Sequence, residues 1–110
     1  MATATYKVLA QSAPSATTNT DVYTVGAGKQ AIISTITVCN RSATAATYRI
    51  AIRPDGAALA NQHYIAYGTT APANDTIALT FGMTVDASDV ITVYASSADL
   101  SFTLFGSEIA

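Results

Sequence analysis

The sequence contains little charge, a single cysteine, a single histidine and no tryptophan. Charged residues make up 11% of its 110 residues, whereas an average soluble domain has roughly 25%. Five Lys and Arg stand against seven Asp and Glu, a formal charge of -2. Because phosphate binding needs clustered basic residues, and these are spread apart, we expect no nucleic-acid partner. The low charge also predicts outer faces that other protein surfaces cover.

The single Cys39 has no partner for a disulfide within the chain, and no second Cys or His stands at metal-ligand spacing. We expect it to be a small apolar residue in a strand. Residues 1–20 include Lys7 but no continuous apolar stretch of signal-peptide length, and no apolar run elsewhere approaches a membrane span. The sequence therefore predicts synthesis in the cytoplasm without a signal peptide, and no membrane partner.

Alanine and threonine are abundant instead, at 22 and 17 residues. Half of the residues are hydrophobic, which is enough for a chain of this length to build one core without disulfides or metals. We expect a single domain with an N-terminal arm and loop at residues 1–19 and a body at residues 20–110. The Ser- and Thr-rich segment 14–20 would allow residues 2–11 to exchange between subunits.

Apolar and polar residues alternate in short segments, and no window shows the spacing of an amphipathic helix. Turn residues separate these segments. The pattern predicts eight strands, at residues 5–11, 21–25, 30–40, 45–53, 62–67, 76–83, 90–95 and 100–105. Eight short strands with regular turns favour an all-β fold, an eight-stranded antiparallel sandwich resembling a jelly roll.

Strand alternation also predicts which side chains face the core. Three sets are predicted to face inward: Ile77, Leu79, Phe81, Met83 and Val85; Tyr48, Ile50 and Ile52; and Leu100, Phe102 and Leu104. In strand 30–40, Ile32 and Ile36 fall on one side and Ile33 on the other. A strand that is apolar on both sides is predicted to be covered on both sides.

The outward positions form the candidate interface. Strand 76–83 and its continuation place small uncharged groups outside, while strand 45–53 places two arginines there. The candidate interface residues are Thr76, Ala78, Thr80, Thr84, Arg49, Arg53, Tyr64 and Tyr67.

The two tyrosines of strand 62–67 have two open interpretations. Exposed aromatic side chains can anchor a protein partner or stack on sugar rings. Alternation puts Tyr64 on the face opposite His63 and Tyr67, so at least one of these rings is expected outside or in an interface.

Catalytic motifs are missing from the sequence. His63 is the only histidine, and no Ser stands in a Gly-x-Ser-x-Gly turn. Glycoside hydrolysis needs two acids that flank a cleft, and Glu108, the only glutamate, sits near the end of the chain, so catalysis of this type is not expected. We expect a protein that is not an enzyme, with no cofactor, in which His63 is a surface or interface group.

Four acidic residues fall in predicted turns: Asp75, Asp86, Asp89 and Asp99. Calcium favours oxygen-rich loops, but the spacing of Asp86 and Asp89 lacks the alternating ligands of an EF-hand. Asp next to Asn, Ser and Ala is common in turns. We therefore expect these residues to shape turns and no metal to be bound.

Several segments follow a shared plan of strands and turns. Residues 23–28 read YTVGAG, residues 31–42 AIISTITVCNRS, residues 48–54 YRIAIRP, residues 72–76 PANDT, residues 89–95 DVITVYA and residues 104–108 LFGSE. From Thr20 onward, this arrangement resembles small virion-associated proteins of tailed bacteriophages. Gly26 stands where the turn in those proteins usually has Pro.

The resemblance implies a structural component of a phage virion, either a capsid decoration (cement) protein or a part of the tail or baseplate. It implies a homo-oligomer, with a trimer favoured, that contacts major capsid or tail proteins. Closed symmetry would bury the uncharged Thr and Ala faces. The alternative is a carbohydrate- or receptor-binding module of a tail fibre, which would use Tyr64 and Tyr67.

Overall fold

The computed structural model describes residues 3–110, so the first two residues of the predicted arm lie outside the described residues. The strands of this part of the chain are β1 (Ala4–Ser12), β2 (Thr20–Thr24), β3 (Gln30–Asn40), β4 (Ala46–Arg53), β5 (Tyr64–Ala71), β6 (Thr76–Asp86), β7 (Val90–Ala95) and β8 (Leu100–Ile109). Two short 3-10 turns, η1 (Pro54–Gly56) and η2 (Asn61–His63), stand between β4 and β5. The eight predicted strands are confirmed, although β5, β6 and β8 end later than predicted.

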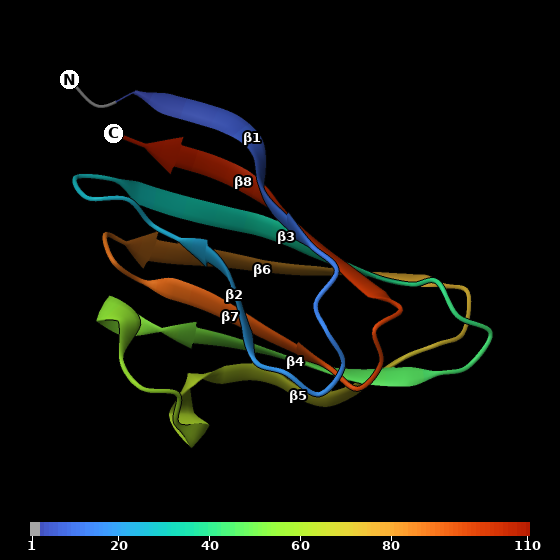
Figure 1. Cartoon of the computed structure of the whole chain (residues 1–110). Helices are drawn as coiled ribbons and strands as arrows, with labels where there is room; N and C mark the ends of the chain where they lie inside the picture. Colours follow the sequence, from blue (N-terminus) through green and yellow to red (C-terminus); the bar gives the residue numbers. More distant parts are fainter. Residues whose placement is uncertain (1–2) are drawn as a thin grey trace.

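The described strands form two four-stranded antiparallel sheets (Figure 1). We call them sheet A, in the order β1-β8-β3-β6, and sheet B, in the order β2-β7-β4-β5. Pairing of β1 with β8, β2 with β7, β3 with β6 and β4 with β5 is the pattern of one long hairpin rolled into a jelly roll. The predicted all-β antiparallel sandwich is confirmed. Residues 4–12 of the predicted arm form an edge strand of sheet A.

The core lies between the two sheets. Tyr48 of sheet B and Phe102 of sheet A are fully buried and meet edge to face, with ring centroids 6.3 Å apart. Leu100, Leu104 and Ile50 are fully buried beside them, as alternation predicts. Burial of each such side chain contributes about 1.5–3 kcal/mol to stability.

Strand β6 follows its predicted pattern except at one residue. Met83 and Val85 are buried, and Ile77 and Leu79 pack against the core. Phe81, predicted to face inward, is 39% exposed. The next residue, Gly82, has a φ of 63°, and β6 carries one extra residue relative to β3 at this point. A bulge of this kind bends the strand and re-aims side chains, so the prediction for Phe81 was wrong.

Strand β3 has a bulge of its own, and this bulge changes which residues reach the core. Ile33 pairs with Gly106 of β8 and Thr35 pairs with Phe105, which leaves Ser34 as an extra residue. The extra residue inverts the alternation. Ile33 and Ile36 are therefore both fully buried, while Ile32 points outward and is 39% exposed. The prediction that Ile33 and Ile36 face opposite sides of the strand was wrong. Within residues 3–110, no other part of the chain covers the outer side of β3 at Ile32.

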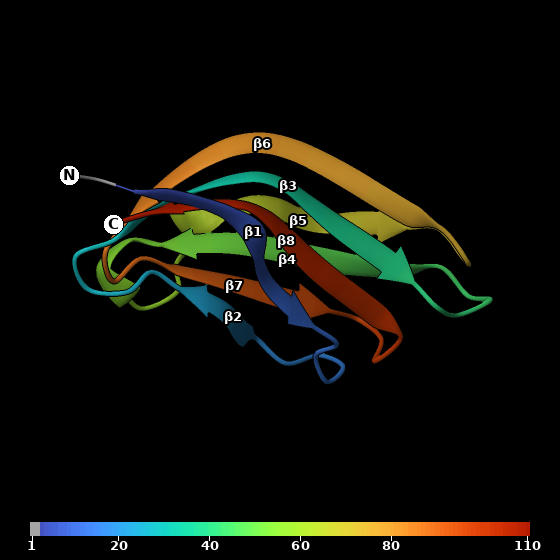
Figure 2. The same cartoon turned by 90° about the horizontal axis from the view of Figure 1, so that it is seen from above.

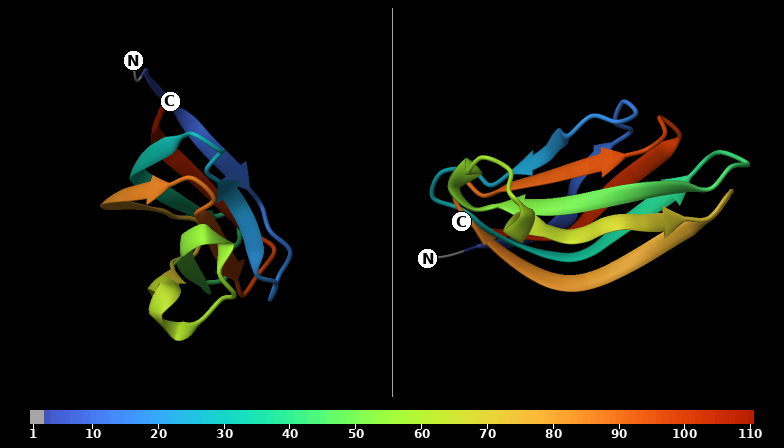
Figure 3. Two further views of the ribbon diagram at one scale, coloured as in Figure 1. Left: turned by 90° about the vertical axis from the view of Figure 1, so that its left-hand side faces the viewer. Right: turned by 90° about the horizontal axis from the view of Figure 1, so that it is seen from below.

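The sheets curve strongly along the strands. Figure 2 shows β6 and β3 arching over the flatter strands of sheet B, and the body measures 48 × 28 × 19 Å. Figure 3 shows residues 54–63, which include η1 and η2, projecting at one end of sheet B. The two ends of the described chain lie at the same end of the sandwich (Figure 1). The broad outer faces of the sheets are thus the largest surfaces available to a partner.

Gly106 is expected to be essential for the bulge in β3. A Cβ atom at Gly106 would overlap the backbone oxygen of Ile32, and backbone cannot swing away as a flexible side chain can. We expect Gly106→Ala to destabilise the protein by about 1–3 kcal/mol or more in urea unfolding.

The matched control is Gly26→Ala, because a Cβ there would meet only the Lys29 side chain, 3.4 Å away. Its effect is expected to stay within about 0.5 kcal/mol. Equal stability of Gly106→Ala and wild type would contradict this close approach of β3 to β8.

Candidate functional site

The outer face of sheet A consists of side chains that stand in rows across its strands. Strand pairing and alternation place the following residues on it: Ala4, Tyr6, Val8 and Gln11 of β1; Ser101, Thr103, Phe105, Ser107 and Ile109 of β8; Gln30, Ile32, Thr35, Thr37 and Cys39 of β3; and Thr76, Ala78, Thr80, Thr84 and Asp86 of β6. We call this surface the sheet A face. One row runs from Tyr6 through Ser107 and Ile32 to Thr84.

The sheet A face is almost without charge. Among its residues only Asp86, at the end of β6, carries a carboxylate, and none carries a basic group. Lys7 belongs to β1 but alternates away from this face, and its ammonium group lies 2.6 Å from the Glu108 carboxylate. Hydroxyl and methyl groups cover the rest, so the face can be desolvated at lower cost than a charged surface.

Large apolar side chains stand exposed on the same face. Tyr6 is 85% exposed, and Val8, Ile32 and Phe105 are also exposed. Val8 and Phe105 are direct cross-strand partners. Contiguous exposed apolar groups mark interaction surfaces on folded proteins.

Four of the sequence-predicted interface residues lie on this face. Thr76, Ala78, Thr80 and Thr84 are all exposed on β6, an edge strand of sheet A. Sequence reasoning missed the apolar residues Tyr6, Val8 and Phe105. The sequence pattern could have identified Phe105, because it follows Leu104, the last residue of a set predicted to face inward, and therefore faces outward by alternation.

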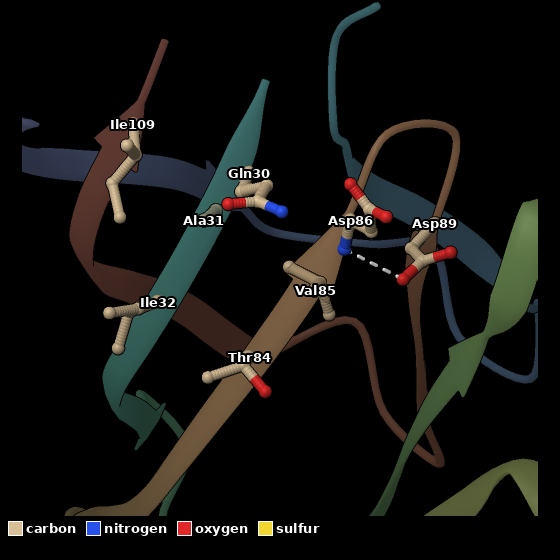
Figure 4. Close-up of a pocket in the computed structure, with 8 residues that line it drawn as sticks. All are labelled: Gln30, Ala31, Ile32, Thr84, Val85, Asp86, Asp89 and Ile109. Carbon is tan, nitrogen blue, oxygen red and sulfur yellow. Dashed lines mark hydrogen bonds between the residues drawn. The ribbon is translucent and has the colours of Figure 1, made fainter. Parts of the chain in front are cut away.

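A shallow hollow of about 320 Å³ lies at one end of the sheet A face (Figure 4). Its lining residues come from β3, β6, β8 and the turn after β6: Gln30, Ala31, Ile32, Thr84, Val85, Asp86, Asp89 and Ile109. Ile32, Thr84 and Ile109 of the sheet A face border the hollow, and the core residues Ala31 and Val85 form part of its lining.

Acidic side chains hold turns at both ends of β6. The Asp89 carboxylate accepts the N–H of Asp55 at 2.9 Å and the N–H of Asp86 at 2.8 Å, the second of which Figure 4 shows. The Asp86 carboxylate accepts the N–H of Ala87, and that of Asp75 accepts the N–H of Thr76. Within residues 3–110, no group of three or more His, Cys, Asp or Glu side chains is placed to hold a metal ion.

The outer face of sheet B has a different chemistry. Arg49 of β4 stands between its cross-strand neighbours Tyr67 of β5 and Tyr94 of β7. Its guanidinium carbon lies 4.3 Å from the centroid of the Tyr67 ring and 4.2 Å from that of Tyr94. Such cation–π contacts hold the guanidinium group in place. Among residues 3–110, no carboxylate forms a salt bridge with Arg49.

Tyr64 and Tyr67 lie together on this side of the molecule. Their ring centroids are 4.9 Å apart and the rings are nearly perpendicular, at 86°. With Asn61 they line a recess of about 270 Å³, and Tyr67 is 62% exposed. The prediction that alternation separates these two rings was wrong, because β5 carries an extra residue between Tyr64 and Ala66 relative to β4.

Arg53, the other predicted interface arginine, is bound within the chain. It donates to Thr92 at 3.0 Å, to the Asp21 carboxylate at 2.9 Å and to the backbone oxygens of Gly56 and Ala57. These bonds join β2, β4 and β7 to the η1 turn. The Arg53 guanidinium group therefore holds the fold together and does not stand free on the outer face of sheet B.

His63 and Cys39 occupy positions that differ in burial. His63 is buried in η2, and its Nδ1 accepts the N–H of Ala60 at 3.0 Å. The prediction of a strand residue at the surface was therefore wrong, because the ring holds a turn. Cys39 is half-buried on the sheet A face, between Thr76 and Ser101.

An ionic cluster joins the two sheets at the edge formed by β1 and β2. The Glu108 carboxylate, on the inner side of β8, contacts the Lys7 ammonium and accepts a hydrogen bond from the Tyr23 hydroxyl at 2.6 Å. Hydrogen bonds from Lys7 and then Tyr23 lower the pKa of Glu108. Burial, followed by the bond to Glu108, raises the pKa of Tyr23.

No protein-family model, curated protein or solved structure matches this chain. Across residues 3–110, the chain forms no helix with the length and apolarity that a membrane crossing requires.

The Glu108 cluster predicts a pH-dependent part of the stability. Because folding lowers the Glu108 pKa, this contribution is complete above the ordinary Glu pKa of about 4.3 and is lost as the pH falls through the lower pKa of the folded state. We expect Glu108→Gln to cost about 1 kcal/mol at pH 7 in urea unfolding, and the difference from wild type to shrink below about pH 4.

Lys7→Met is the companion variant, since it removes the other half of the ion pair. The double variant should lose less stability than the sum of the two single losses. A difference between wild type and Glu108→Gln that stays constant with pH would contradict the role given to this cluster.

Proposed function

We propose that this chain is a non-enzymatic structural protein of a bacteriophage particle, which assembles with copies of itself through the sheet A face. The observation that carries the proposal is the nearly uncharged surface of sheet A, with Val8, Ile32 and Phe105 exposed on it. A surface of this kind loses little on leaving water and gains from apolar burial.

A second copy suits this surface better than a charged partner does. A carboxylate or ammonium group of a partner would lose its hydrating water against the sheet A face and would find no opposite charge there. A second uncharged face does not bear this desolvation cost. The face also offers a projecting side chain, Tyr6, and a hollow beside Ile32 and Ile109. Assembly of identical copies requires complementary features of this kind on the surface that they share.

The size of the face favours shallow contacts shared among several proteins. Four strands about 4.8 Å apart, with rows about 6.6 Å apart, give a flat area on the order of 500 Å². A stable interface buries about 800 Å² on each partner. We therefore propose a small closed oligomer, with a trimer favoured, that also contacts the major capsid protein as a decoration (cement) protein or contacts tail proteins.

The phage part of the proposal is supported by the strand-and-turn resemblance of residues 23–28, 31–42 and 104–108 to virion-associated proteins. The non-enzymatic part is supported by the commitment of His63 and Asp89 to turns. Location in the virion after synthesis in the host cytoplasm belongs to the same proposal.

Placing a charge on the sheet A face should dissociate the oligomer. Tyr6→Lys and Thr84→Lys change exposed side chains, so folding should be preserved. By light scattering, we expect wild type to show a multiple of the 11.3 kDa chain mass and both variants to shift to the chain mass.

Thr47→Lys is the control, because Thr47 is exposed on the outer side of sheet B. It should leave the oligomer intact. A monomeric wild type, or dissociation by Thr47→Lys alone, would contradict assembly through the sheet A face.

A further inference from the structure

The outer face of sheet B presents a cation that no acidic residue of the described chain pairs with. Arg49 is held from two sides by the rings of Tyr67 and Tyr94, with its guanidinium carbon 4.3 and 4.2 Å from the ring centroids. The two salt bridges within residues 3–110 involve Lys7 and Arg53 instead. Contact with two rings restricts the guanidinium group, so its N–H groups are pre-organised for an anion.

A recess adjoins this arginine. Tyr64 and Tyr67 meet at 86° and form two walls of a corner, and Asn61 completes the lining. Tyr67 links Arg49 to the recess, since its ring contacts the guanidinium group and also lines the recess. Arg49 does not line the recess itself, so a ligand that packs there and extends past the Tyr67 ring would meet the guanidinium group.

We propose that this site binds an acidic sugar, a ring that carries a carboxylate. The carboxylate accepts hydrogen bonds from Arg49, the apolar side of the ring packs against Tyr64 and Tyr67, and the Asn61 amide bonds to a ring hydroxyl. This binding activity goes beyond the assembly role and does not depend on it.

The dimensions and chemistry of the site select this ligand class. Its volume of about 270 Å³ lies below the roughly 300–1,000 Å³ of sites for drug-sized ligands, so it accommodates one ring rather than a helix or a folded partner. Apolar walls with a few polar groups fit a molecule that has both an apolar side and hydroxyl groups. A cationic ligand would be repelled by Arg49, and a neutral sugar would leave that charge without a partner.

The site and the sheet A face lie on opposite sides of the sandwich. Asn61, Arg49, Tyr64 and Tyr67 belong to sheet B and its η2 turn. Assembly through sheet A would therefore leave the site open to solvent, and repeated copies would present it many times. Multivalent display strengthens weak binding without new contacts.

The test uses the full chain on an array of oligosaccharides that end in a uronic or sialic acid, each placed beside its neutral counterpart. We expect binding to acidic probes and not to their neutral counterparts. Arg49→Gln and Tyr67→Ala should each lower the affinity about tenfold or more, as expected for the loss of a charge-assisted hydrogen bond or a stacked ring. Lys29→Gln removes an exposed positive charge elsewhere and should bind like wild type.

Melting temperature and oligomer mass are measured on the same samples, so that loss of folding or assembly is distinguished from loss of binding. Binding to no probe, equal binding to acidic and neutral probes, or wild-type affinity in both Arg49→Gln and Tyr67→Ala would overturn the proposal. None of these results would change the oligomer mass, so the assembly proposal is tested separately.

Discussion

The close approach of β3 to β8 at Gly106 is the constraint on which the rest of the structure depends. The absence of a side chain at Gly106 lets the backbone of Ile32 and Ile33 pass over it, and β3 gains its extra residue, Ser34, at the same point. The bulge turns both Ile33 and Ile36 into the core and leaves Ile32 outside. One glycine thus helps to complete the core and to make the sheet A face apolar.

The sequence predicted the number of strands, the sandwich and most inward side chains, because alternation is a direct consequence of strand geometry. It failed where strands carry extra residues. Ile32, Phe81 and the pair of Tyr64 and Tyr67 all lie next to bulges, and one extra residue reverses the faces that alternation assigns. Glycines inside strands, such as Gly82 and Gly106, were the available signal, since they often mark bulges.

Burial of polar groups was less predictable from the sequence. His63 and Arg53 were expected outside, yet both bind backbone groups of the segment that links β4 to β5. Their partners come from the fold of that segment, which short-range patterns do not describe. The pairing of Arg49 with Tyr94 likewise depends on strand order, because β4 and β7 are far apart in the chain.

The two sheets therefore divide the surface into a nearly uncharged face, for which we propose assembly, and an aromatic face with Arg49, for which we propose a ligand. The most direct measurement is a cryo-microscopy reconstruction of virus particles released from cells that carry this gene. The account predicts that the chain is present, with the sheet A face against a second copy or a capsid or tail protein, and with Arg49 and Tyr67 facing solvent. Absence of the chain from the particles, or a sheet A face exposed to solvent within them, would contradict it.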